Sequence, residues 1–288
     1  MILPVNTFIA TAEAVLLCGA TPVFVDHDEY FNIDPARIEE RIGSRTKAVI
    51  AVHLYGQPAR MTELKAICDR RRLILFEDAA QAHLARFDST FVGNWGLATC
   101  FSFYPGKNLG AYGEGGAVLT RDAAMAERMR ELRDHGSHGK YNHVVAGTNY
   151  RMEALQGAVL ETKLKHLDGW TALRKGRAAM YLERLASITT VIAPRVHACA
   201  DPVWHLFVVR VPDRDRLQDY LMRRGVSTGL HYPVPLHRQP AFSTSEEARR
   251  SFPNAEVNAG EVLSLPMYPE LSESSIDRVC SEIRQFYG

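Results

Sequence analysis

Lys107 lies in the stretch of this sequence with the clearest potential for chemistry. An apolar, β-forming run at 98–103 ends before Pro105, and Lys107 follows two residues later. A glycine-rich turn then leads into a second apolar run at 117–120. Burial at a strand end would lower the pKa of the lysine amine, because burial disfavours its charged form. Such an amine can form a Schiff base. A lone lysine in a loop is more commonly a solvated charge. Whether Lys107 has a chemical role therefore depends on which other residues lie near it.

Two more polar side chains follow the apolar run Leu73–Phe76. Asp78 comes just after this predicted strand, and Gln81 stands three residues further on. A carboxylate at a strand end can bind a protonated ring nitrogen, and a helical turn from Asp78 would bring Gln81 to the same side. The alternative is that Asp78 caps the next helix, which is the more common use of aspartate at such a position. If the strands are parallel, Asp78 and Lys107 share one edge of the sheet.

The pattern of apolar residues predicts strands that alternate with helices. This alternation indicates an α/β fold with a mostly parallel sheet covered on both faces. The sequence changes character from Val191 onward, and we expect a domain boundary near 167–186. This predicts a large domain at 1–170 and, at 171–288, a connector helix with a smaller α+β domain. Residues 231–240 hold three prolines and should be extended. The expected strands are 22–26, 46–52, 73–76, 98–103, 117–120, 204–211 and 226–230. The expected helices are 8–17, one that starts at Asp34-Pro35, 61–71, 123–134, 152–166, 171–185 and 214–223. Asn6-Thr7 should cap the first of them, and Asp168-Gly169 should separate 152–166 from 171–185.

Composition excludes several classes of protein. The chain has 34 basic and 33 acidic residues in 288, so its net charge of +1 gives no case for nucleic acid or an anionic membrane as partner. No apolar run is long enough for a membrane helix, and no basic residue precedes Arg37 to form a secretion signal. The five cysteines are widely spaced, which predicts a reduced, cytoplasmic setting. Histidine spacing predicts no metal site, and the glycines at 110–116 do not form a dinucleotide-binding motif.

Six stretches, taken together and in order, are more specific than any one alone. They resemble the DegT/DnrJ/StrS family of sugar-nucleotide aminotransferases, which are pyridoxal-phosphate enzymes with the aspartate-aminotransferase-like fold. The resemblance covers nearly the whole chain, and the stretch around Lys107 is its most specific part. The stretches are Pro4–Thr11, Glu77–His83, Ser102–Leu109, Gly147–Met152, Thr228–His237 and Leu263–Leu271.

The resemblance implies a role for each site residue. Lys107 would bind the cofactor covalently and then move the proton between substrate and cofactor, and Asp78 would pair with the pyridinium nitrogen. The cofactor's ring and phosphate would be held by Gln81, Phe8, Ser102 and, from the neighbouring subunit of a homodimer with shared active sites, Asn149. The substrate side would be lined by Arg151, His231 and Tyr232. The implied reaction moves an amino group from glutamate to a keto group of a nucleotide-linked sugar.

The sequence departs from the family pattern in two places. Leu84 stands where a glycine is usual, so we expect its side chain to crowd the turn. Family members also carry several dozen residues before the Asn-Thr-Phe stretch, including a Gly-Thr motif at a helix N-terminus that holds the cofactor phosphate. Three explanations remain open: a fragment, a wrongly assigned start, or a true truncation. The missing segment makes a non-catalytic truncated homologue one alternative function. The alternative within catalysis is a related pyridoxal-phosphate sugar dehydratase, an enzyme in which a histidine replaces the lysine.

Overall fold

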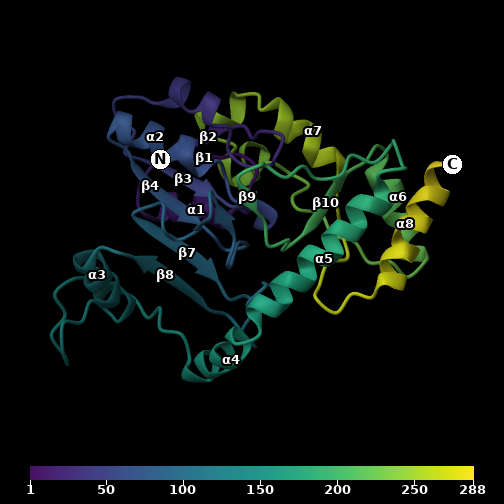
Figure 1. Ribbon diagram of the computed structural model, residues 1–288. Helices are drawn as coiled ribbons and strands as arrows, with labels where there is room; N and C mark the ends of the chain where they lie inside the picture. Colours follow the sequence, from purple (N-terminus) through teal and green to yellow (C-terminus); the bar gives the residue numbers. More distant parts are fainter.

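The computed structural model describes residues 1–288 and shows two lobes joined by the long helix α5 (Leu167–Leu185) (Figure 1). The larger lobe is built on a six-stranded sheet with strand order β2-β1-β3-β4-β7-β8. The first five strands in this order are parallel and β8 is antiparallel, which confirms the predicted mostly parallel sheet. The strands are β1 (Ile2–Pro4), β2 (Val23–Val25), β3 (Ala48–Val52), β4 (Ile74–Asp78), β7 (Ala98–Ser102) and β8 (Gly116–Thr120).

Apolar residues cover both faces of this sheet. Ile2 packs with Met61 and Leu64 of helix α2 (Met61–Arg71), whereas its neighbour Leu3 belongs to a second cluster with Val15 of α1 (Ala10–Leu17). Successive residues of a strand point to opposite faces, so β1 contributes to two separate cores. The other helices of this lobe are α3 (Ala123–Arg133) and α4 (Ala154–Leu164).

The smaller lobe packs α5, α6 and α8 around an antiparallel strand pair. Its core includes the rings of Tyr181 and Phe207, which stack with centroids 4.8 Å apart, together with Leu217, Leu263 and Ile276. The elements are β10 (Phe207–Arg210), β11 (Val262–Leu265), α6 (Arg214–Arg223) and α8 (Glu273–Tyr287). A small three-stranded sheet is formed by β5 (Arg86–Phe87), β6 (Thr90–Phe91) and β9 (Ala200–Asp201).

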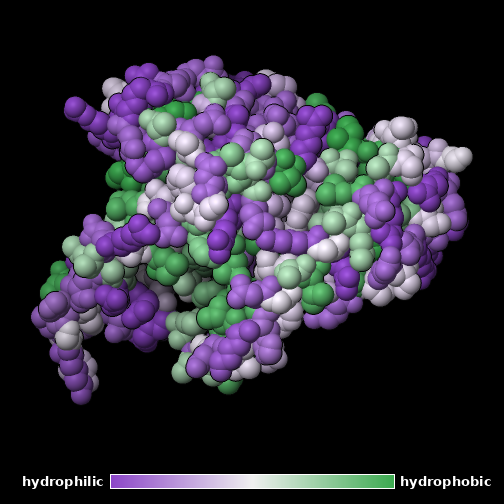
Figure 2. Space-filling model, viewed as in Figure 1, coloured by the Kyte–Doolittle hydropathy of each residue, from purple (hydrophilic) through white to green (hydrophobic).

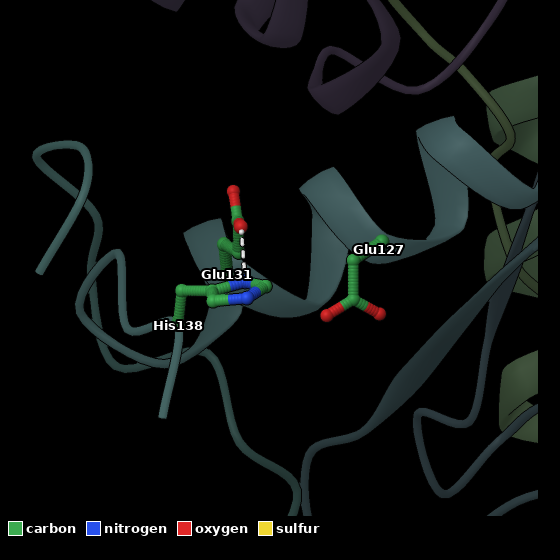
Figure 3. Close-up of side chains that lie close together, drawn as sticks. All are labelled: Glu127, Glu131 and His138. Carbon is green, nitrogen blue, oxygen red and sulfur yellow. Dashed lines mark hydrogen bonds and ion pairs between the residues drawn. The ribbon is translucent and has the colours of Figure 1, made fainter. Parts of the chain in front are cut away.

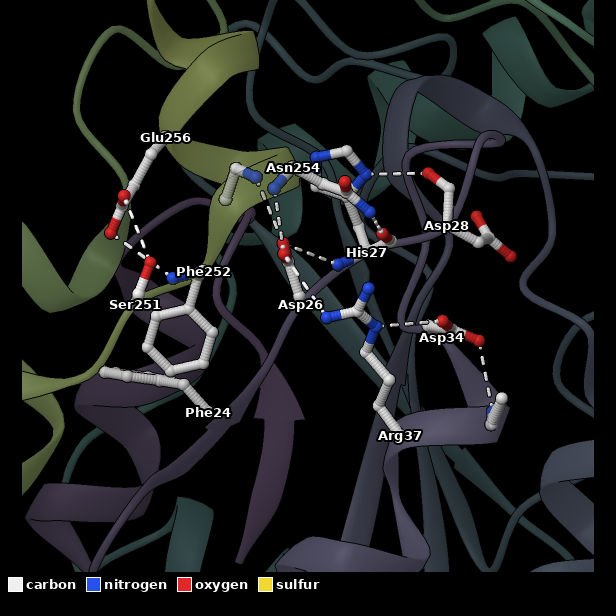
Figure 4. A network of polar contacts seen from close by, with 12 residues as sticks. Phe24, Asp26, His27, Asp28, Asp34, Arg37, Ser251, Phe252, Asn254 and Glu256 are labelled. Atoms are coloured by element: carbon white, nitrogen blue, oxygen red, sulfur yellow. Dashed lines mark hydrogen bonds and ion pairs between the residues drawn. The ribbon is translucent and has the colours of Figure 1, made fainter.

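One segment of the C-terminal part returns to the large sheet. Phe242 and Phe252 pack against Phe24 of β2, with T-shaped ring contacts at 5.3 and 6.4 Å. Helix α7 (Pro253–Glu261) follows, and the Asp26 carboxylate accepts hydrogen bonds from the backbone N–H groups of Asn254 and Ala255 at 2.9 and 3.0 Å (Figure 4). The N-terminus of α7 is therefore capped by a residue more than two hundred positions away in the chain.

Several predicted elements need correction. The helix expected at Asp34-Pro35 is a pair of 3₁₀ turns, Pro35–Arg37 and Glu39–Arg41, although Asp34 does cap the first by accepting from the Ala36 N–H. The strand expected at 226–230 is a single bridge between Gly229 and Ser264. The expected cap at Asn6-Thr7 is also wrong, because α1 begins at Ala10 without a side-chain cap.

The expected break at Asp168-Gly169 lies inside α5. The buried residues Leu167, Thr171, Arg174 and Ala178 follow helical spacing across the glycine. Packing of this face therefore outweighs the poor helix propensity of one glycine. No helix of the chain combines the length and the apolar character needed to cross a membrane.

Candidate active site

A cavity of about 720 Å³ lies where β3, β4 and β7 end, and Lys107 is part of its wall. The carboxyl ends of parallel strands meet at one edge of a sheet, so residues that are distant in the chain converge here. Seven of the nine residues predicted for the site line this cavity: Lys107, Asp78, Gln81, Ser102, Phe8, His231 and Tyr232. The other two, Asn149 and Arg151, are not among its lining residues.

The turn around Lys107 holds the amine inside the cavity. The Lys107 N–H donates to the carbonyl of Tyr104 at 2.9 Å, and the chain closes tightly on Gly110. A Cβ at position 110 would lie 2.3 Å from the carbonyl oxygen of Pro105, so only glycine fits. Burial lowers the pKa of Lys107, and the charge of Asp78 opposes this shift. The lysine is therefore placed as the sequence predicted, partly buried and facing a carboxylate.

Asp78 is the last residue of β4, and its carboxylate is oriented by two donors. Oδ2 accepts from the hydroxyl of Thr11 at 2.7 Å, and Oδ1 accepts from the Ala80 N–H at 3.1 Å. Residues 79–82 form turns, so no helix begins at Asp78 and the helix-cap alternative is wrong. The role of Thr11 was missed by sequence reasoning, although it lies within the Pro4–Thr11 stretch.

Gln81 links the two walls of the cavity. Its Oε1 accepts from the Tyr55 N–H at 2.6 Å, and its Nε2 donates to the hydroxyl oxygen of Tyr232 at 3.3 Å. Burial raises the pKa of Tyr232 to about 12, so its hydroxyl keeps its proton at neutral pH. The rings of Tyr232 and Phe8 lie 5.7 Å apart. Tyr55 carried no recognisable signal in the sequence, because its contact is made by the backbone.

Ser102 and His231 both line the cavity. Ser102 ends β7, and its Oγ accepts from the Tyr104 N–H at 3.2 Å. The Nδ1 of His231 lies 2.8 Å from the Ser264 hydroxyl of β11, and burial lowers the pKa of this histidine. The backbone carbonyl of His231 accepts from the Tyr55 hydroxyl. The segment 231–232 therefore connects the cavity to the strand pair of the smaller lobe.

A buried network stands behind Asp78. Glu77 accepts from the backbone N–H groups of Trp95 and Gly96 at 3.1 and 2.9 Å, from the Thr99 hydroxyl at 2.9 Å, and from His53 at 3.1 Å. Because the other ring nitrogen of His53 accepts from the Ala59 N–H, its Nε2 carries the hydrogen and donates to Glu77. Burial alone would raise the pKa of Glu77, but these donors hold it at about 2.

Asn149 and Arg151 lie in an exposed loop between α3 and α4. The backbone of Asn149 forms a bridge with Asp134, and the guanidinium of Arg151 pairs with the Asp134 carboxylate. Both predicted roles therefore concern residues outside the chain's own cavity, and they stay predictions.

Leu84 adopts a left-handed backbone conformation, with φ of +70°. A β-carbon is unfavourable in this region, whereas glycine adopts it freely. The expected crowding thus takes the form of backbone strain at the position where the family pattern has glycine. The Leu84 side chain packs at the edge of the cluster formed by Ala82, Ala85 and Val203, which offsets part of this cost.

A slightly larger cavity, about 780 Å³, lies beyond β2. Several of its charged side chains are paired with one another. Arg60 lies 3.3 Å from Asp28 and 3.0 Å from Asp34, and Arg37 lies 3.2 Å from Asp34 (Figure 4). Burial raises the pKa of Asp28 to about 7. This cavity lacks a lysine or another strong nucleophile, so the cavity at Lys107 is the candidate active site.

A second group of polar side chains lies on α3 and the loop after it. Ligand atoms of Glu127, Glu131 and His138 lie within 4.8 Å of one another (Figure 3). Both carboxylates already pair with an arginine of the same helix, Glu131 with Arg128 at 3.0 Å and Glu127 with Arg130 at 3.3 Å. Surface ion pairing accounts for this cluster.

The fold and the cavity together define a class of protein. A partly buried lysine that faces a carboxylate at the carboxyl edge of a mostly parallel sheet is suited to hold an aldehyde cofactor. The chain belongs to the DegT/DnrJ/EryC1/StrS aminotransferase family, whose model matches residues 1–284. Pyridoxal phosphate is the cofactor of this family, and the side chains of the cavity fit it.

Two curated relatives and one solved structure illustrate this membership. The chain is 49% identical over 285 residues to the erythromycin biosynthesis sensory transduction protein EryC1 of Saccharopolyspora erythraea, covering 99% of this chain and 78% of the relative. It is 46% identical over 287 residues to the dTDP-3-amino-3,4,6-trideoxy-alpha-D-glucose transaminase of Streptomyces venezuelae, covering 99% of this chain and 76% of the relative. The crystal structure of S. venezuelae DesV in complex with a ketimine intermediate superposes with a TM-score of 0.96 at 46% identity, covering 99% of this chain and 77% of DesV.

Proposed function

We propose that this protein transfers an amino group from glutamate to a keto group of a nucleotide-linked sugar, in the biosynthesis of amino sugars. The observation that carries the proposal is the convergence of Lys107, Asp78 and Gln81 on one cavity. The names of the relatives support the substrate class, because they include transaminases of dTDP-linked and UDP-linked sugars at 42–46% identity. A histidine in place of Lys107 would have favoured the dehydratase alternative, and Lys107 is present.

Each cavity residue has a task that its surroundings support. Bound pyridoxal phosphate supplies an electron sink for the carbon that gains or loses the amine. Asp78, oriented by Thr11 and the Ala80 N–H, would hold the ring nitrogen protonated. Phe8 would cover the face of the ring. Lys107, whose pKa is lowered by burial, would accept a proton at Nζ and return it.

Gln81 and Ser102 would orient the group bound at Lys107. The Gln81 amide is fixed by Tyr55 and Tyr232 and would lie beside the ring oxygen of the cofactor. The Ser102 hydroxyl would donate to the phosphate, and His231 and Tyr232 would line the substrate side. These assignments rest on the position of each side chain in the cavity wall.

The same proposal includes a homodimer with shared active sites. Asn149 and Arg151 are exposed and lie outside their own chain's cavity, so a partner subunit is where they would act. The surface nearby is rich in exposed apolar side chains: Leu119, Tyr112, Tyr150, Leu155 and Leu164. Figure 2 shows apolar residues gathered around the hollow between α4 and the sheet. Such a surface is typical of an interface. Sedimentation of the wild type should give a dimer, and a monomer would contradict this part of the proposal.

We also propose a cytoplasmic location and the division into 1–170 and 171–288. All five cysteines are unpaired, which suits a reducing compartment. The smaller lobe has its own core of residues between Ala178 and Ile283, while the segment 236–255 adds to the core of the larger lobe.

The test is substitution of the lysine. Lys107→Ala should abolish the visible absorption that appears when pyridoxal phosphate binds covalently, while the thermal unfolding midpoint stays close to that of the wild type. Lys165→Ala, which changes an exposed lysine at the end of α4, is the matched control and should leave the spectrum unchanged. An unchanged spectrum in Lys107→Ala would contradict the assignment of Lys107 and the proposed function with it.

A further inference from the structure

The glycine-rich turn after Lys107 is a feature of the sequence that the proposed function does not use. Residues 108–111 are buried, although none of them belongs to a helix or a strand. Buried backbone N–H and C=O groups need hydrogen-bond partners, and a turn without regular structure has to find some of them elsewhere. The origin of these partners shows what holds the turn that carries Lys107.

Two side chains of helix α4 supply partners for this turn. The Oε1 of Gln156 accepts from the backbone N–H of Tyr112 at 2.8 Å, and the Lys163 ammonium donates to the carbonyl of Gly110. Only 7% of Gln156 is exposed, so the amide is held in place by the atoms packed around it. One donor and one acceptor of the turn are therefore satisfied from α4.

Both bonds come from one face of α4. Gln156, Leu160 and Lys163 are spaced by four and three residues, which places them on the same side of a helix. Leu160 belongs to the apolar cluster that contains Leu109 and Ala111 of the turn. Gln156 and Leu160 are the buried residues of α4, so the buried face of this helix is directed at the turn after Lys107.

The glycines of the turn allow α4 and the segment before it to come this close. A Cβ at Gly113 would lie 3.2 Å from Nε2 of Gln156. A Cβ at Gly115 would lie 3.0 Å from the sulfur of Met152, two residues before α4 begins. Both distances are shorter than an ordinary van der Waals contact, so a larger residue would push the helix away from the turn.

The backbone connects these contacts to Lys107. The N–H of Ala111 donates to the carbonyl of Phe103 at 2.8 Å, so Lys107 lies in a loop that is closed at its base. The two bonds from α4 are made at Gly110 and Tyr112, the neighbours of Ala111 on either side. α4 therefore holds the base of the loop from which the lysine side chain extends.

We propose that Gln156 is a positioning residue for Lys107 and that Lys163 assists it, because together they fix the base of the loop that keeps the amine in the cavity. Neither Gln156 nor Lys163 lines the cavity, so both act through the backbone of the turn. This inference rests on the proposed function only in taking Lys107 as the reactive amine.

The first measurement is hydrogen exchange of the full chain without added cofactor. Gln156→Met keeps the length of the side chain and removes the acceptor without a change of charge. Exchange at 110–112 should therefore rise about tenfold, whereas α2 should exchange as in the wild type. Unchanged exchange at 110–112 in Gln156→Met would overturn the proposal.

A second pair of variants keeps the test decisive if Gln156→Met does not fold. Lys163→Met removes the donor to Gly110 and should also speed exchange at 110–112. Lys165→Met is the matched control, because this exposed lysine directly follows α4 and the change of charge is the same. It should exchange as the wild type does. Equal exchange in Lys163→Met and Lys165→Met would overturn the role of Lys163.

The last measurement separates positioning of Lys107 from a contact that only covers the turn. It is the pKa of Lys107, taken without cofactor as the midpoint of the pH dependence of reductive methylation by formaldehyde and followed by peptide mass spectrometry. Burial lowers the pKa of this amine, so a loosened loop that admits water should raise it by about half a unit in Gln156→Met. Methylation at a fixed pH below the midpoint should then slow about threefold.

A wild-type pKa of Lys107 in spite of faster exchange at 110–112 would overturn the proposal, because α4 would then only cover the turn. All of these measurements are made without cofactor. Their outcome is therefore separate from that of the Lys107→Ala spectrum, which tests the proposed function itself.

Discussion

At the scale of single residues, Asp78 and Glu77 are neighbours in β4 with different environments. Asp78 points into the cavity and has two donors, from Thr11 and Ala80. Glu77 points to the opposite face, is fully buried, and is surrounded by donors from the loop at 93–96, from Thr99 and from His53. The alternation of side chains along a strand gives these adjacent carboxylates separate tasks, one facing the cavity and one holding the loop behind it.

Asp78→Asn should leave the cofactor bound but slow amino transfer by about a hundredfold or more, because a neutral amide does not hold a ring nitrogen protonated as a carboxylate does. The rate of amino transfer in a single turnover is the measurement. Asp69→Asn on the exposed face of α2 is the control and should have the wild-type rate. Near-normal turnover in Asp78→Asn would show that Asp78 has no such role.

Glu77→Gln should destabilise the fold at neutral pH. The pKa of Glu77 is about 2 in the folded protein and 4.5 when unperturbed, so its ionised form favours folding. This contribution is complete above pH 4.5 and is lost as the pH falls towards 2. A shift of this size corresponds to about 3 kcal/mol. Urea unfolding of both proteins should show the difference at pH 7 and a smaller one at pH 3. A constant difference across this range would contradict the assignment.

At the scale of elements, α5 shows how packing decides where a helix begins. Its buried residues recur at helical spacing from Leu167 to Leu185, and this continuous face crosses Gly169. The cavity wall also depends on α5, because Arg174 of this helix donates hydrogen bonds to the backbone carbonyls of Trp204 and His205. A break in α5 would therefore disturb the cavity wall.

Gly169→Ala should stabilise the protein by up to about 1 kcal/mol, since alanine has the better helix propensity and loses less entropy on folding. A β-carbon at this position meets no atom within 4 Å, so there is no steric cost. The test is the free energy of unfolding in urea. Gly56→Ala, at φ of +92° and with a β-carbon 2.8 Å from the His205 nitrogen, is the opposite case and should be strongly destabilising. A destabilised Gly169→Ala would mean that α5 is not continuous there.

At the scale of the whole molecule, the C-terminal part is fastened to the first strands of the sheet. Phe252 packs on Phe24, and the Asp26 carboxylate caps α7. The Glu247 carboxylate also accepts from the Phe24 N–H at 3.1 Å and pairs with Arg41 at 2.5 Å. These contacts join residues near opposite ends of the chain, so the two lobes should unfold together.

Asp26→Ala should release the N-terminus of α7. Besides the bond from the N–H of its neighbour His27, it removes the two hydrogen bonds that the N–H groups of α7 donate to a buried carboxylate, and these two cost about 2–3 kcal/mol. Hydrogen exchange should increase within 253–261 and leave α2 unchanged. Asp122→Ala, which removes the exposed local cap of α3, is the control and should cost about 1 kcal/mol. Unchanged exchange in α7 would show that packing alone holds it.

The sequence by itself determined the helices and strands whose pattern is local and strong. α2 and α6 have the predicted bounds, Met61–Arg71 and Arg214–Arg223, because their apolar spacing and flanking residues lie within the helix itself. The six stretches of the family pattern likewise identified the family and seven of the residues that line the cavity. All of these signals depend on residues that are close together in the chain.

Only the tertiary structure decided how distant residues meet. The bond from Thr11 to Asp78, the contact of Tyr55 with Gln81, and the ring of His205 beside Asn108 join positions between 26 and 97 residues apart. The segment Ile2–Pro4 lies between β2 and β3 only because the sheet places it there. A contact between distant residues leaves no periodic pattern in either segment. It is fixed by the packing of both segments on a common core, and that packing is a property of the folded chain.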